Sequence, residues 1–367
     1  MLPYLFVFSV CILLCTIYKD NRRWPIWVVC ILLSSLAGFR DKGVGTDTLV
    51  YTDQYFQEAL YCDSLFDVVN NDTGLDVCFL ALAYFASLFT HDIWLFYFLI
   101  EFVISIFIIL AFIRLSKNYK IHPAVFLLSY MLIVFNYSLN AMRQECAMSI
   151  VLFAYSYILE RKWIPYIFFS FIAFLFHSTT IITLVLVGFY VMSNIENEKV
   201  RALLIVLSLA IMVVAINFYY ELLNYLGEGS NSMMEHFANG YGINSRFDNT
   251  DRIPKTELGL ALLGYFVMYL SYRRRIIAGS VLSFHFIINS VFLLSLFLSY
   301  YNIYAYRIGL YFLLISILLW SMEMSSNKIK LYEHIIVYFI VLFYWVYSYI
   351  FLGNSETIPY TSRILGV

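Results

Sequence analysis

The sequence predicts an all-α, polytopic membrane protein, and three observations support this fold class. The 367 residues are 62% hydrophobic and only 13% charged, and the mean hydropathy is +0.79. Apolar runs recur along the chain, and many approach the length of about 20 residues that spans a bilayer as a helix. Lysine and arginine gather between those runs. A soluble domain of this length does not need so much apolar surface.

Apolar segments alternate with polar or basic stretches. Lysine and arginine prefer the cytoplasmic side of a membrane protein, and placing every basic cluster there puts 15 of the 23 basic residues inside. The segments are 2–18, 24–39, 75–89, 92–113, 122–137, 142–159, 163–176, 179–192, 201–220, 257–271, 278–300, 308–324 and 333–351. The clusters are Lys19/Arg22/Arg23, Arg114/Lys117/Lys120, Arg161/Lys162, Lys199/Arg201, Arg273/Arg274/Arg275 and Lys328/Lys330.

The segment 75–89 conflicts with that placement. If it and 92–113 both crossed the membrane, the basic cluster at 114–120 would lie outside. The segment is short and opens with Asp76. We therefore expect a re-entrant or interfacial helix on the outer side, about 12 transmembrane helices, and both termini outside. A short, tilted thirteenth crossing remains the alternative.

The chain is predicted to form a single integral membrane domain over 1–367, with a first outer loop at 40–74 and a large outer loop at 221–256. The first apolar segment lacks a basic leader and a small-residue cleavage site, so we expect a retained helix. A net charge of −1 gives no basic face for nucleic acid. No cysteine or histidine spacing indicates a metal site, and a disulfide between Cys62 and Cys78 stays open.

Three helices that run inward on this topology begin beside a basic or titratable side chain. Arg143 stands at the start of one helix, and His177 and Arg307 stand just before two others. The N-terminal end of a helix attracts anions, and arginine binds phosphate through two parallel hydrogen bonds. Asn140 and Gln144 share a helix face with Arg143 because they lie at helical spacing. The arrangement predicts a site for a pyrophosphate at the outer leaflet.

Each of these residues also has a simpler explanation. An arginine at a helix end often reaches toward lipid headgroups, and a lone histidine often makes a structural hydrogen bond. Three of them on one side favour a binding site. Glu101 and Glu145 lie within apolar runs, where carboxylates are functional candidates. Arg143 is the simplest expected partner for Glu145.

The stretch GVGTDTLVYTDQYF, residues 43–56, lies in the predicted first outer loop. Its glycines permit a sharp turn. Thr46 or Asp47 can cap a short helix on which Tyr51 and Tyr55 share a face. Carboxylates accept hydrogen bonds from hydroxyl groups and aromatic faces stack on sugar rings, so the stretch is typical of a sugar-binding surface. An amphipathic interfacial helix with an aromatic belt is the alternative.

Several motifs together resemble the EpsG family, a branch of the Wzy-type O-antigen and capsule polymerases. They are FRDKGVGTDTLVYTDQYF, LNAMRQECAMSIVLFAYSYILERKW, IAFLFHSTTIITL, YRIGLYF and the terminal TIPYTSRIL. The resemblance runs from about Arg40 to the C-terminus, and it depends on the joint order and spacing of short motifs. The segment 220–256 contains no motif that matches.

The resemblance implies a metal-independent glycosyltransferase with a GT-C-like architecture in the bacterial inner membrane. A glycan on undecaprenyl pyrophosphate would be transferred to another lipid-linked repeat unit at the periplasmic side, and the lipid pyrophosphate would leave. The implied partners are undecaprenyl-pyrophosphate-linked oligosaccharide donor and acceptor, membrane lipids and, as a further candidate, a chain-length regulator protein. No cofactor and no nucleic acid is expected.

Roles for individual residues follow from this reaction. Asp47 is the first candidate for the general base and His177 the second. Arginines would neutralise the departing pyrophosphate. The candidates for substrate binding are Arg40, Thr46, Tyr51, Asn140, Arg143, Gln144, Arg246, Arg307 and Tyr311.

Two other functions stay open on the sequence. An O-antigen ligase uses the same donor but usually carries a larger outer domain than the 221–256 loop. A lipid-linked oligosaccharide flippase would have polar residues along a central cavity and often internal repeats. Here the polar motifs gather at one face, which favours the polymerase.

Overall fold

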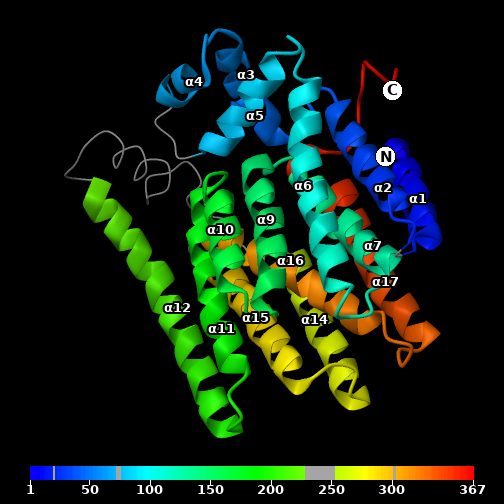
Figure 1. Cartoon of the computed structure of the whole chain (residues 1–367), viewed down its shortest axis with the longest axis vertical. Coiled ribbons are helices and arrows are strands. Elements are labelled where there is room, and N and C mark those ends of the chain that lie inside the picture. Colours follow the sequence, from blue (N-terminus) through cyan, green and yellow to red (C-terminus); the bar gives the residue numbers. More distant parts are fainter. Residues whose placement is uncertain (20, 72–75, 228–252, 301–302) are drawn as a thin grey trace. The chain divides into compact units, whose positions relative to one another are not determined.

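The named elements of the structure, a computed structural model, are all helices (Figure 1). They belong to two compact units, Met1–Ile181 with Met324–Val367 and Ile182–Glu323. The all-α prediction is therefore confirmed. The structure describes residues 1–19, 21–71, 76–227, 253–300 and 303–367.

Four helical stretches in these ranges are long and apolar enough to cross a membrane: Trp94–Leu115, Gly279–Leu298, Ala305–Met324 and Leu331–Phe351. Shorter apolar helices accompany them, among them Leu2–Ile17, Trp24–Gly38 and Trp163–Phe174. Together they indicate a polytopic membrane protein, because only helices and closed barrels satisfy their backbone groups in lipid. The number of twelve crossings and the single integral membrane domain stay predictions.

The first unit is a helical bundle in which α6 packs against α2 and α9, and α9 packs against α10. Proline stands in the first turn of α1, α2 and α7, where its missing N–H costs no hydrogen bond. The α-helices are α1 Leu2–Ile17, α2 Trp24–Gly38, α3 Asp53–Leu60, α4 Leu65–Asn71, α5 Val77–Ser87, α6 Trp94–Leu115, α7 Pro123–Ile133, α8 Phe135–Ser138, α9 Met142–Ile158, α10 Trp163–Phe174 and α17 Leu331–Trp345. The π-helices η1 Thr48–Thr52 and η3 Val346–Phe351 and the 3-10 helix η4 Asn354–Glu356 complete the unit.

The helix α5 is the segment whose crossing was in question. Its 11 residues rise about 16 Å, well short of a hydrocarbon core of about 30 Å. It packs against α3, α4 and α6, and the N–H of Cys78 donates to the carbonyl of Leu175 at 3.0 Å. Because α7 is equally short at 11 residues, length alone does not separate a crossing from an interfacial helix, and the placement of α5 in the membrane stays a prediction. Cys62 and Cys78 are not joined by a disulfide.

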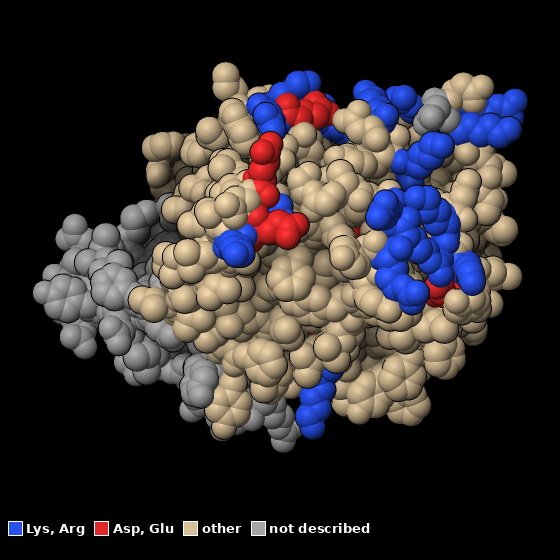
Figure 2. Space-filling model, turned by 90° about the horizontal axis from the view of Figure 1, so that it is seen from below, with Lys and Arg blue, Asp and Glu red and all other residues tan. Residues whose placement is uncertain are grey.

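Basic loops of the first unit meet at one end of the bundle. Arg114 and Lys162 both form ion pairs with Glu160, and the N–H of His122 donates to Ser325 Oγ at 2.8 Å. These contacts join the loops that follow α6, α9 and α16. The hydrogen bond from Lys162 and the charge of Arg114 hold the pKa of Glu160 below its usual range. Figure 2, a view from below, shows Lys and Arg side chains gathered in groups.

The C-terminal segment packs against the loop that follows α2. The N–H of Asp41 donates to the carbonyl of Thr361 at 2.9 Å, and the N–H of Gly45 donates to the carbonyl of Glu356 at 3.0 Å. The hydroxyl of Tyr360 donates to the carbonyl of Leu36 at 2.8 Å, and burial raises the pKa of Tyr360 to about 12. Two motifs at opposite ends of the sequence therefore form one structural element.

The second unit contains α11, α12, α14, α15 and α16, and α15 packs against both α11 and α14. The bounds are α11 Val185–Ser193, α12 Glu198–Gly227, α14 Lys255–Arg274, α15 Gly279–Leu298 and α16 Ile303–Met324.

Two helix starts differ from the sequence prediction. Ser178–Leu184 is a 3-10 helix, η2, before α11 begins, so His177 does not precede an α-helix directly. In the second unit α16 begins at Ile303, which places Arg307 inside the helix rather than before it. The sequence YNIYAYR contains no helix-breaking glycine or proline, so nothing there delays the helix until residue 308.

Candidate functional site

Asn140 fixes the loop that follows α2. Its Oδ1 atom accepts hydrogen bonds from Thr46 Oγ1 and from the N–H of Asp47, both at 2.8 Å. Gly45 precedes them with φ +97°, and a Cβ there would lie 2.9 Å from the carbonyl oxygen of Leu139. Only glycine adopts this conformation without strain and permits this approach. Two features therefore hold the loop against the turn before α9. The amide of Asn140 binds it, and the lack of any side chain at Gly45 permits the close approach.

Asp47 and Tyr51 form the next contact. The hydroxyl of Tyr51 donates to Asp47 Oδ2 at 2.6 Å. The sequence predicted that Thr46 or Asp47 would cap this helix; Asp47 occupies the N-cap position of η1 but makes no side-chain capping hydrogen bond. The predicted shared face of Tyr51 and Tyr55 is confirmed, since their ring centroids lie 6.2 Å apart.

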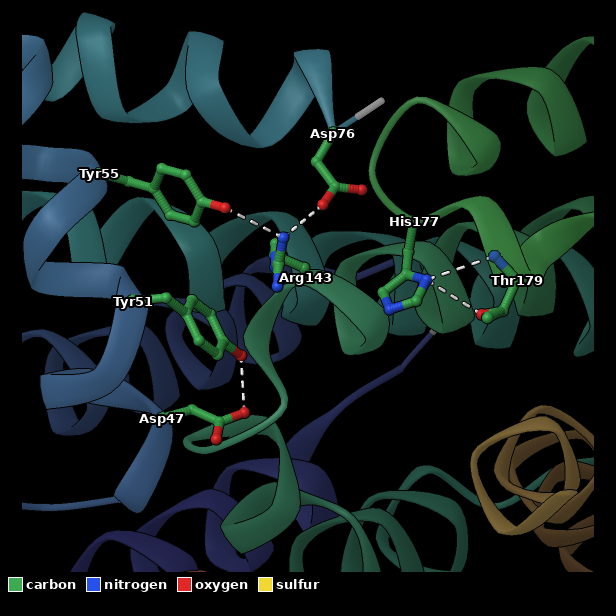
Figure 3. A network of polar contacts seen from close by, with 7 residues as sticks. All are labelled: Asp47, Tyr51, Tyr55, Asp76, Arg143, His177 and Thr179. Carbon is green, nitrogen blue, oxygen red and sulfur yellow. Dashed lines mark hydrogen bonds and ion pairs between the residues drawn. The ribbon is translucent and has the colours of Figure 1, made fainter. Parts of the chain in front are cut away.

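The guanidinium of Arg143 lies between aromatic rings and a carboxylate (Figure 3). Its Cζ atom is 4.4 Å from the ring centroid of Tyr51 and 5.5 Å from that of Tyr55. Its Nη1 atom donates to Asp76 Oδ2 at 2.5 Å and to the Tyr55 hydroxyl at 3.4 Å. Cation–π contacts and a charge-assisted hydrogen bond hold this side chain at the start of α9.

Asp76 is the member of the site that sequence reasoning missed. It precedes α5, and its side chain is 12% exposed. The only signal in the sequence was an aspartate at the opening of a short apolar segment, and its partner Arg143 is far away along the chain. Arg143 was expected to pair with Glu145, and that expectation is wrong. Both carboxylate oxygens of Glu145 are buried without a hydrogen-bond partner in the structure.

His177 follows α10 and is 4% exposed. Its Nδ1 atom faces the backbone N–H of Thr179 at 3.3 Å and Thr179 Oγ1 at 3.0 Å. A backbone N–H can only donate, so Nδ1 accepts and the proton of the neutral ring lies on Nε2. In this tautomer Nε2 is a hydrogen-bond donor, which favours Asp47 over His177 as a proton acceptor. Figure 3 draws His177 and Arg143 in one view, and its dashed lines join His177 to Thr179 and Arg143 to Tyr55 and Asp76.

Arg40 and Gln144 lie behind the surface of the site. Arg40 is 4% exposed, and its Nη2 atom donates to the carbonyl of Leu139 at 3.0 Å. Its Cζ atom lies 4.3 Å from the ring centroid of Tyr97. Gln144 is 2% exposed and accepts from the Tyr137 hydroxyl at 3.4 Å. These contacts support a role in shaping the site rather than direct contact with substrate.

The remaining candidates are not grouped with Arg143 by these contacts. Arg307 and Tyr311 belong to the second unit, where Tyr311 is 1% exposed. Near them the hydroxyl of Tyr306 donates to Glu257 Oε1 at 3.2 Å, which links α16 to α14. Arg246 lies outside the described residues, so its role stays a prediction.

Among the described residues, no group of three or more His, Cys, Asp and Glu side chains could hold a metal ion. What the geometry supplies instead is a cation, two carboxylates and two tyrosines at one end of the first unit. These groups suit a ligand that carries both phosphate and sugar.

The fold and this site define a polytopic helical membrane protein with a polar site at one end of a bundle. The chain belongs to the EpsG family, whose model matches residues 23–362. The family is linked to exopolysaccharide biosynthesis. No curated protein and no solved structure matches the chain.

Proposed function

We propose that this protein is a surface-polysaccharide polymerase of the bacterial inner membrane. It joins undecaprenyl-pyrophosphate-linked oligosaccharide repeat units at the outer face of that membrane. The donor glycan is transferred to a second lipid-linked repeat unit, and the lipid pyrophosphate is released. Membership of the EpsG family supports the general pathway, and the site supports the reaction type.

The observation that carries the proposal is the position of Arg143. It is the second residue of α9, where the helix dipole and the first backbone N–H groups also attract an anion. Its guanidinium contacts Tyr51, Tyr55 and Asp76. A pyrophosphate on this arginine places the attached sugar beside tyrosine rings that can stack on it.

In this proposal Asp47 serves as the general base. Tyr51 contacts both Asp47 and Arg143, so one tyrosine separates the proposed base from the proposed anion site. In the reaction the acceptor hydroxyl gives its proton to the carboxylate, and its oxygen forms the new bond to the anomeric carbon. The bond from that carbon to the pyrophosphate breaks, and the leaving group departs with the electron pair. Electrostatic stabilisation of that leaving group by arginine is the largest expected contribution.

Asp76 orients Arg143 in the absence of substrate. The carboxylate occupies Nη1, and a pyrophosphate must share the guanidinium with it or displace it. An arginine held in advance loses less rotational freedom when it binds. Asn140 has the same function for the loop, because its amide oxygen fixes both Thr46 and Asp47.

The chain-length phenotype of a deletion strain tests the function. Loss of a polymerase leaves single repeat units on the cell surface, and loss of a flippase traps them inside. Loss of a ligase leaves long polymer that is not attached to its final acceptor. We expect single surface units, restored to long chains by the wild-type gene. Long chains in the deletion strain would contradict the proposal.

A further inference from the structure

A chain of buried polar side chains links α14, α15 and α16 in the second unit. His285 Nδ1 lies 2.8 Å from Glu323 Oε1, and His285 Nε2 lies 3.0 Å from Ser316 Oγ. Ser316 Oγ lies 3.2 Å from Asn289 Oδ1, and Asn289 Nδ2 lies 2.9 Å from the carbonyl oxygen of Ala261. The side chains of His285 and Glu323 are completely buried. None of these residues belongs to the proposed active site.

The donor and acceptor chemistry of these groups fixes the direction of each hydrogen bond in the series. The carbonyl of Ala261 can only accept, so the amide nitrogen of Asn289 faces it and Oδ1 faces Ser316. Oδ1 can only accept, so Ser316 uses its single hydroxyl proton there. The Ser316 oxygen must therefore accept a hydrogen bond from His285, and Nε2 of that ring carries a proton.

The other ring nitrogen must share a second proton with the carboxyl group. Without one, lone pairs of His285 Nδ1 and Glu323 Oε1 would face each other at 2.8 Å, which is repulsive. With one, the pair has no net charge, as an imidazolium with a carboxylate or as a neutral imidazole with a carboxylic acid. Glu323 Oε2 is buried without a hydrogen-bond partner in the structure. An unpartnered oxygen costs more on a buried carboxylate than on a neutral acid.

We propose that His285 and Glu323 form an intramembrane proton-binding site, in which a protonated Glu323 donates to Nδ1 of a neutral His285. The ligand is a proton, and its bond joins α15 to α16. Its loss would leave a buried negative charge next to the lone pair of Nδ1. Carboxyl groups at such depth are functional candidates in membrane proteins. The proposal does not rest on the polymerase function.

Gly264 on α14 leaves room for the Asn289 amide at the far end of this series of hydrogen bonds. A Cβ at Gly264 would lie 2.5 Å from Asn289 Oδ1, the atom that accepts from Ser316. Gly264→Ala should therefore displace the Asn289 amide and disturb the hydrogen bonds up to His285. Gly259 on the same helix has nothing within 4 Å of an added Cβ, which makes Gly259→Ala the matched control.

Infrared spectroscopy of the full-length protein in nanodiscs tests the proton on Glu323. The wild type should show a protonated carboxyl C=O band that is lost in Glu323→Gln. The glutamine amide can donate to Nδ1 in place of the acid, so this variant should keep the wild-type melting temperature. Glu323→Ala should lower it. No loss of an acid band in a folded Glu323→Gln protein, or failure of that variant to fold, would overturn the proposal.

A measurement on the wild type keeps the test independent of Glu323 variants. Ring ¹⁵N NMR, with His285 assigned by the signal lost in His285→Asn, should show a proton on Nε2 and none on Nδ1. Protons on both nitrogens would establish the ion pair and refute the neutral arrangement. Gly264→Ala should shift these resonances, and Gly259→Ala should leave them in place. Equal shifts in both variants would contradict the proposed chain.

Discussion

Asp76 Oδ2 lies 2.5 Å from Arg143 Nη1, and this ion pair joins the short helix α5 to the first turn of α9. The arginine that is proposed to receive a pyrophosphate therefore already has an anionic partner. Both side chains keep some exposure, 21% for Arg143 and 12% for Asp76, so an incoming anion can reach the guanidinium. Because the proposed anion site depends on this arginine, Arg143 is the first residue to substitute.

Arg143→Lys should lower polymer synthesis by about 100-fold, because lysine keeps the charge but cannot bind phosphate through two parallel bonds. The measurement is polymer chain length in the complemented deletion strain, with membrane insertion checked by immunoblot. Asp76→Asn is the matched variant, since it leaves an acceptor for Arg143, and we expect it to make polymer. Chains of near-normal length in Arg143→Ala would refute the anion site.

Asp47→Asn should abolish polymer, with a fall of about 100- to 10,000-fold, because asparagine cannot accept the proton of the acceptor hydroxyl. Asparagine still accepts a hydrogen bond from Tyr51, so the loop and donor binding should persist. His177→Gln should remain partly active, because the tautomer of His177 favours a donor role. Ordinary polymer from Asp47→Asn together with an inactive His177→Gln would transfer the base to His177. Polymer length and binding of a lipid pyrophosphate are the two measurements.

Asn140→Ala should lower activity by about 10- to 100-fold, because it releases Thr46 and Asp47 from their shared acceptor and displaces the base. Asn140→Asp restores an acceptor oxygen at the same position and should recover most of that loss. Assays of polymer formation by the purified variants separate the two. Equal activity in the alanine and aspartate variants would show that these hydrogen bonds do not position Asp47.

Gly45→Ala should destabilise the protein by about 1–3 kcal/mol, because alanine at a positive φ is strained and its Cβ would approach the Leu139 carbonyl. Gly43→Ala is the control, since nothing lies within 4 Å of an added Cβ there. Thermal unfolding in detergent compares the two. Equal melting temperatures would show that the loop adapts to a side chain at Gly45.

Cysteine labelling of intact cells should place the proposed site outside. Single cysteines at the exposed positions Lys42 and Arg363 should react with a membrane-impermeant reagent, and those at Lys117 and Lys328 should be protected until the cells are opened. The native cysteines are first replaced by serine. Arg274 and the segment around His236 extend the same test to the second unit and to the 221–256 loop. Protection at position 42 would reverse the orientation and exclude the outer-face reaction.

The sequence by itself determined most of the apolar helices of this protein, although the starts of α11 and α16 differ from the prediction. Apolar runs fix helices in a lipid environment, since every backbone group must find its partner within the segment. The observed α2 and α9, Trp24–Gly38 and Met142–Ile158, follow the predicted segments within about two residues. The motif order also sufficed for the family, because the EpsG match covers residues 23–362.

Only the tertiary structure decided the partners of the polar residues. Arg143 could pair with a neighbour such as Glu145 on local grounds, yet it contacts Asp76 from a helix far away in the sequence. Such a pairing depends on how helices pack, and apolar periodicity carries no information about it. The same holds for Asn140, whose amide reaches the loop at Asp47. The sequence thus gives the residue types and the helices that present them, and long-range packing selects which side chains meet.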